Sequence, residues 1–153
     1  MNATRSALLR TVPTFTRRTL LAGGLGLFAG TCSSAMEPLP ADVGLVVDMK
    51  EYVITLDRAT LRAGVVKIGI RNLGRMVHDF DLYRTELPAD KLPVDGGSAK
   101  VKMEGLVRQM MNIAPNRSAT LSVELSPGNH VVICNIAGHY QLGMRIGLRV
   151  DPS

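Results

Sequence analysis

The stretch CNIAGHYQLGM, residues 134 to 144, places a cysteine, a histidine and a methionine five residues apart. The runs HVVIC and MRIGLRV at its two ends are rich in β-branched and alternating apolar residues, which predicts two strands. These strands would be antiparallel neighbours joined by residues 135–143, where Gly138 and Gly143 permit backbone angles that other residues avoid. Such a hairpin can direct a thiolate, an imidazole and a thioether towards one centre.

The rest of the chain also predicts strands. Apolar or alternating runs occur at 52–56 (YVITL), 65–70 (VVKIGI), 77–83 (VHDFDLY, with one buried face) and 118–125 (SATLSVEL), the last followed by a turn at SPGN. Residues 86–105 contain Pro88, Pro93 and Gly96-Gly97 without a clear period, which predicts a long loop, and a short helix is an option at Leu106–Met111. This pattern indicates an all-β sandwich or barrel.

The basic charge of the chain is concentrated at its start. The 153 residues carry a formal charge of +5, but residues 1–35 hold four arginines and no acid. Without them, 14 basic residues face 13 acidic ones. No basic patch with interleaved aromatic residues remains, so nucleic acid is not an expected partner.

Residues 1–35 are predicted to be a signal peptide, followed by one domain over residues 36–153. The pair Arg17-Arg18, an apolar run from Leu20 to Ala29 and small residues up to Ala35 resemble a Tat signal of an exported, periplasmic protein. A general secretory leader is one alternative. Lipid anchoring through Cys32 is another, although the residues before it make a poor lipobox.

The donor types after residue 130 predict a copper site. Two imidazoles, a thiolate and a weak axial thioether are the ligands of blue copper, so Cys134, His139 and Met144 need a second histidine. His130 lies on the same strand as Cys134 and about 13 Å from it, at ~3.3 Å per residue, which is too far to share one ion. His78 is therefore the fourth predicted ligand, and His130 is assigned to structure or surface.

Two segments resemble the cupredoxin family. NLGRMVHDF is similar to the Asn-x-Gly-x-x-x-His strand, and SPGNHVVICNIAGHYQLGM is similar to the Pro-Gly turn, strand and Cys-x4-His-x4-Met loop. The resemblance covers residues 43–150, and plastocyanin, pseudoazurin and rusticyanin have the most similar spacing. It implies a Greek-key β-sandwich with one copper ion, held by His78, Cys134, His139 and Met144, in a small monomeric electron carrier.

The sequence departs from this pattern at two positions. Ala137 stands where the family often has proline, and Asp79 stands where asparagine often follows the first histidine. An ionised carboxylate at Asp79 would favour Cu(II).

The resemblance also implies a docking surface for redox partners such as a cytochrome, oxidase or reductase. Residues that flank the predicted ligands, namely Met76, Ala137, Tyr140 and Leu142, would form an apolar collar around His139. A transient encounter between redox proteins needs only a small interface.

Two functions fit these ligands. The first is electron transfer without substrate turnover, and the second is copper handling by a chaperone or resistance protein, because soft sulfur ligands suit both. An enzyme is not expected: a nitrite reductase or multicopper oxidase needs a further copper site and another domain. A binuclear copper centre needs a second cysteine in the loop, and residues 135–138 are Asn, Ile, Ala and Gly.

Overall fold

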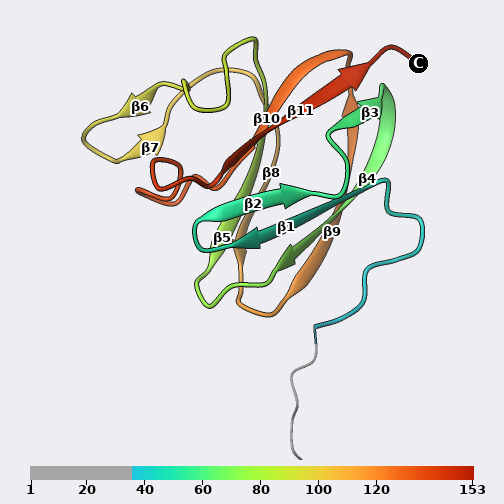
Figure 1. Ribbon diagram of the computed structural model, residues 1–153, viewed down its shortest axis with the longest axis horizontal. Helices are drawn as coiled ribbons and strands as arrows, with labels where there is room; N and C mark the ends of the chain where they lie inside the picture. The colour runs from blue at the N-terminus through green and yellow to red at the C-terminus, as the bar shows by residue number, and fades with distance from the viewer. Residues whose placement is uncertain (1–35) are drawn as a thin grey trace, which may run out of the picture. The chain divides into compact units, whose positions relative to one another are not determined.

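A computed structural model of the protein describes residues 36–153 (Figure 1). The predicted leader, with Arg17-Arg18 and Cys32, lies outside the described residues. Across residues 36–153, no helix is long and apolar enough to span a membrane.

The first sheet contains four strands in the order β2-β1-β4-β9. Its members are β1 (Leu45–Lys50), β2 (Val53–Leu56), β4 (Gly64–Asn72) and β9 (Ser118–Leu125). Strand β1 pairs with β4 in parallel, and the other pairs are antiparallel. In β1 and β9, buried residues alternate with more exposed ones, as expected when one face of a sheet covers a core.

The second sheet contains five strands in the order β3-β11-β10-β5-β8. Its members are β3 (Thr60–Arg62), β5 (His78–Arg84), β8 (Leu106–Ile113), β10 (Gly128–Ile133) and β11 (Arg145–Asp151). The predicted hairpin is confirmed, because β10 and β11 pair antiparallel. Strand β10 also pairs with β5, which brings the segment of His78 beside that of Cys134.

The two sheets enclose the main core and form the predicted β-sandwich (Figure 1). Side chains from both sheets meet in this core, including Ile68 and Ile70 of β4 and Phe80 and Leu82 of β5. Cys134 and Met144 belong to the same cluster. The sulfur-bearing side chains are therefore part of the hydrophobic packing of the sandwich.

The predicted long loop covers the outer face of the second sheet. It contains one short hairpin, formed by β6 (Val94–Asp95) and β7 (Lys100–Val101). Leu92 and Val101 of this segment pack with Val131 and Ile133 of β10 in a second buried cluster. The prediction of one buried face for residues 77–83 was therefore wrong, because the loop shields the other face and residues 78–83 are all buried.

The optional helix at Leu106–Met111 is a strand, β8, which pairs antiparallel with β5. Leucine, arginine, glutamine and methionine are good helix formers, but pairing with a neighbouring strand outweighs this weak preference. Strands β1 and β3 were not identified from the sequence. The strands predicted at 52–56, 65–70, 77–83 and 118–125 are confirmed, with ends shifted by up to two residues.

Candidate metal centre

The loop between β10 and β11 is tied together by its own backbone. Cys134 N donates to Met144 O at 3.0 Å, and Met144 N donates to His139 O at 3.0 Å. Gly143 has a φ of 124° and lies against Tyr52, since an added Cβ would be 2.8 Å from the Tyr52 carbonyl oxygen. Glycine is therefore required at this position both for its backbone angle and for the close approach.

His78 is the first residue of β5 and follows a loop held by Asn72. The Asn72 amide donates to Met76 O at 2.7 Å and to Ile113 O at 2.8 Å, and its oxygen accepts from Gly74 N at 2.9 Å. Asn72 is fully buried. The asparagine of the NLGRMVH motif thus fixes the loop that presents His78.

Glu51 holds the same loop from the other side. It follows β1, and its Oε1 accepts from Arg75 N at 2.6 Å and from Met76 N at 2.7 Å. A Cβ on Gly74 would lie 2.8 Å from the Glu51 carboxylate carbon, so the glycine of the motif leaves room for this carboxylate. The backbone N–H groups of Glu51 and then Met76 lower the pKa of Glu51 to about 2, so the side chain is an anion near neutral pH.

Three predicted donors converge at one end of the sandwich. Cys134 Sγ is 3.4 Å from His139 Nδ1 and 3.9 Å from His78 Nδ1, and the three donor atoms lie within 4.8 Å of one another. His78 and Cys134 are fully buried, and His139 is 4% exposed.

These distances fit one shared ion. Imidazole nitrogen lies ~2.0 Å and thiolate sulfur ~2.3 Å from a first-row ion, so in a trigonal plane they are about 3.7 Å apart. The two sulfur–nitrogen distances fall on either side of this value. Two imidazoles and one thiolate are the in-plane donor set of a type 1 copper site.

Met144 is fully buried in the core cluster of Cys134, and its backbone bonds to both Cys134 and His139. The structure thus brings the fourth predicted residue to the same loop end. A thioether suits copper better than zinc, whose structural sites use cysteine and histidine.

The pKa values of two buried donors, His78 and Cys134, are shifted towards the neutral form of each group. Burial lowers the pKa of His78, and the charge of His139 lowers it further. Burial also raises the pKa of the Cys134 thiol. A metal ion that binds here must therefore displace the thiol proton, and its uptake is expected to release a proton.

His130 is apart from this cluster, as predicted. It lies on β10 opposite Arg84 and Leu148, outside the group formed by His78, Cys134 and His139. It is buried in the sandwich and does not lie at the surface, since it is only 2% exposed. Within residues 36–153, neither ring nitrogen has a hydrogen-bond partner.

Asp79 makes two contacts that the sequence did not specify. Its backbone N donates to Cys134 Sγ at 3.3 Å, and its carboxylate accepts from Asn112 N on β8 at 2.8 Å. The carboxylate therefore bonds across to the neighbouring strand β8, while the backbone of this residue supports the thiolate.

The surface around His139 differs in part from the predicted collar. Met76 and Leu142 are 43% and 60% exposed, whereas Tyr140 is buried and its hydroxyl donates to Ala89 O. The prediction that Tyr140 belongs to the collar is therefore wrong, and the sequence did not indicate Tyr52 as a collar residue. The Tyr52 ring contacts His139 edge-on with centroids 5.5 Å apart, and its hydroxyl donates to Met76 Sδ at 3.9 Å. Ala137 is exposed, and we call Tyr52, Met76, Ala137 and Leu142 the apolar collar.

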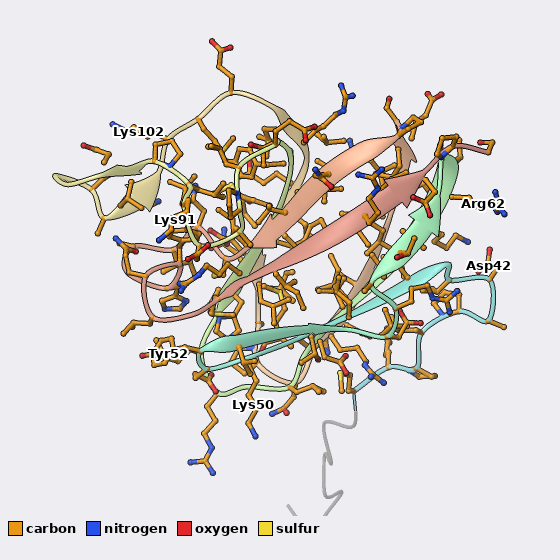
Figure 2. All side chains as sticks on the ribbon, turned by 45° about the horizontal axis from the view of Figure 1, so that its top comes forward. Asp42, Lys50, Tyr52, Arg62, Lys91 and Lys102 are labelled. Atoms are coloured by element: carbon orange, nitrogen blue, oxygen red, sulfur yellow. The ribbon has the colours of Figure 1, made fainter. Side chains whose placement is uncertain are left out.

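Figure 2 shows Tyr52 and Lys50 at one end of the sandwich and Arg62 at the other. Tyr52 and Glu51 follow β1 at a turn far from the ligand motifs in sequence. No local pattern marks them, because their positions depend on the pairing of β1 with β4.

Comparison with solved structures identifies the fold. The chain is 19% identical to reduced auracyanin from the photosynthetic bacterium Roseiflexus castenholzii, with a TM-score of 0.52, over 70% of this chain and 95% of that one. It is 18% identical to auracyanin B, with a TM-score of 0.54, over 78% of this chain and 96% of that one. It is 16% identical to rusticyanin from Thiobacillus ferrooxidans, with a TM-score of 0.51, over 69% of this chain and 76% of that one. The protein has the cupredoxin fold, as predicted. No model of a protein family and no curated protein sequence matches the chain.

Proposed function

We propose that the protein is a small electron carrier with one type 1 copper ion held by His78, Cys134, His139 and Met144. The observation that carries this proposal is the convergence of two Nδ1 atoms and one thiol sulfur in a buried site. Two imidazoles and one thiolate are the donors of a type 1 copper site, so the donor set of this chain itself supports the proposal.

The bound ion would supply a one-electron Cu(II)/Cu(I) couple. His78, Cys134 and His139 would hold the ion through two imidazoles and a thiolate, and Met144 would add a thioether. The hydrogen bond from Asp79 N to Cys134 Sγ would stabilise the thiolate. One electron enters and one leaves, so no substrate is converted and the protein is not an enzyme.

A copper chaperone is the second candidate, since sulfur and imidazole donors also hold Cu(I). Burial of all four residues favours the carrier, because transfer of an ion to a partner requires ligands that the partner can reach. The test is to load the purified protein with Cu(II) and record its visible and EPR spectra. An intense thiolate-to-copper band that ascorbate removes reversibly supports the carrier, whereas a colourless protein that holds only Cu(I) contradicts it.

The ligand assignment has its own test. We expect Cys134→Ser to abolish the colour, because the absorbing thiolate is lost. We expect His130→Gln to retain it, because His130 lies outside the donor cluster. The opposite pair of results would overturn the assignment.

Redox partners are expected to dock at the apolar collar. Tyr52 contacts His139 and Met76, so the collar adjoins one of the predicted ligands. Leu142→Glu should slow electron self-exchange between oxidised and reduced protein, measured by NMR, and leave the reduction potential nearly unchanged. Val65→Glu is the matched control, since Val65 is 77% exposed near the start of β4, away from the site. If both variants slowed electron self-exchange equally, this result would argue against docking at the collar.

We also propose that residues 1–35 direct export to the periplasm. The support is the sequence pattern of paired arginines, a short apolar run and small residues. Replacing Arg17-Arg18 with Lys-Lys should block export if the signal is of the Tat type. Continued export would indicate a general secretory leader.

A further inference from the structure

His78 has a second ring nitrogen that the ligand set does not use. Its Nδ1 faces Cys134, so Nε2 points away from the donor cluster. Nε2 is buried, and among the described residues it has no hydrogen-bond partner at ordinary length. A neutral imidazole that binds a metal through Nδ1 carries its proton on Nε2.

A carboxylate faces this proton. Glu51 Oε1 lies 3.6 Å from His78 Nε2, which is longer than a hydrogen bond but within ion-pair distance. His78 is fully buried and the Glu51 side chain is 22% exposed, so solvent screens this interaction only in part. Carboxylates behind a ligating histidine orient its ring and raise its basicity.

The position of this carboxylate is fixed by the loop that carries His78. The N–H groups of Arg75 and Met76 both donate to Glu51 Oε1, the same atom that faces the ring. Gly74 leaves the space that the carboxylate occupies. Rotation of Glu51 towards solvent would break both hydrogen bonds, so the negative charge is held beside His78.

We propose that Glu51 is a positioning residue for His78 whose negative charge lowers the reduction potential of the copper site. This inference rests on the proposed function. A negative charge close to the imidazole stabilises the more highly charged Cu(II) state more than the Cu(I) state. The carboxylate also restrains the ring through its Nε2 proton. Glu51 is thus assigned a role that the four ligands do not supply.

A purely structural role for Glu51 makes a different prediction. The two backbone hydrogen bonds need only an acceptor oxygen, and a glutamine amide still offers one. Glu51→Gln therefore preserves the length of the side chain and its hold on the loop while removing its charge. If Glu51 only shapes the loop, this variant leaves the potential unchanged.

The experiment measures the reduction potential of copper-loaded wild type and Glu51→Gln by voltammetry. We expect the affinity of the variant for Cu(II), relative to that for Cu(I), to fall roughly tenfold. This change corresponds to a rise of about 59 mV in the reduction potential for one electron. Glu124→Gln is the matched control, because it removes the same charge from an exposed position on β9, outside the site. We expect the control to shift the potential by less than a third of that amount.

The outcomes separate this inference from the proposed function. A blue wild type with an unchanged potential in Glu51→Gln overturns the inference and leaves the carrier function standing. Equal shifts in Glu51→Gln and Glu124→Gln overturn it too, because the effect is then one of overall charge. A wild type without a blue site overturns both.

A measurement on the wild type covers the case in which the variant does not fold. In the Cu(I) form, the Nε2 proton of His78 should give a downfield, slowly exchanging NMR signal with cross-peaks to the Glu51 side chain. A rapidly exchanging proton without these cross-peaks would overturn the inference.

Discussion

Replacement of Asn72 by alanine should destabilise the sandwich strongly and weaken the metal centre with it. Three backbone groups would lose their partners: the carbonyls of Met76 and Ile113 and the N–H of Gly74. The bonds to Ile113 and Gly74 are buried, and each polar group left there costs about 1–3 kcal/mol. With a smaller loss at the part-buried Met76 carbonyl, we expect about 4 kcal/mol in total.

The assay is thermal unfolding of metal-free protein, followed by circular dichroism. In a domain of this size, each kcal/mol lowers Tm by about 4 °C, so Asn72→Ala should melt about 15 °C lower than the wild type. Asn129→Ala is the control, because Asn129 also bonds to two groups, Glu86 and Arg149, but on the exposed surface. It should cost less than about 1 kcal/mol. A loss below about 1 kcal/mol for Asn72→Ala would refute the argument that this asparagine fixes the loop of His78.

Two further predictions concern protons and the axial ligand. Burial lowers the folded-state pKa of His130 below its unfolded value of 6.5, so its contribution to stability is complete above pH 6.5 and declines as the pH falls towards the folded-state pKa. His130→Leu should therefore flatten the loss of stability of metal-free protein as the pH falls below 6.5 in urea titrations, and an unchanged slope would contradict this. Met144→Leu should keep the blue colour, because the in-plane ligands remain, and should raise the reduction potential measured by voltammetry, because an apolar axial group favours Cu(I). A colourless variant would show that Met144 is essential to the site.

Much of the fold follows from alternation along the chain. Residues 118–125 alternate over eight positions, and the strand found there has the same bounds. The sequence of β8 did not indicate a strand because its residues favour helix and five of its eight positions are exposed without alternation, so only its pairing with β5 defines it. The burial of both faces of β5 also could not be predicted, since it depends on where the long loop of residues 86–105 folds back.

The ligands could be predicted because their chemistry is rare. One thiol, two imidazoles and a thioether in fixed spacing leave few alternatives in a chain with three histidines. The supporting residues have ordinary chemistry, and their roles depend on tertiary contact. Glu51 and Tyr52 reach the site only because the first sheet brings the end of β1 beside the loop before His78.

The arrangement of hydrogen bonds also bears on how the site would transfer electrons. Cys134, His139 and Met144 are joined by backbone bonds, and Asp79 N links the thiol to β5 across 55 residues of sequence. These bonds restrain the donors within the fold itself. We therefore expect the donor atoms to keep nearly the same positions in both oxidation states of a bound copper ion. A site with this property loses little energy to rearrangement in each electron transfer, which suits a carrier better than a protein that must release its metal.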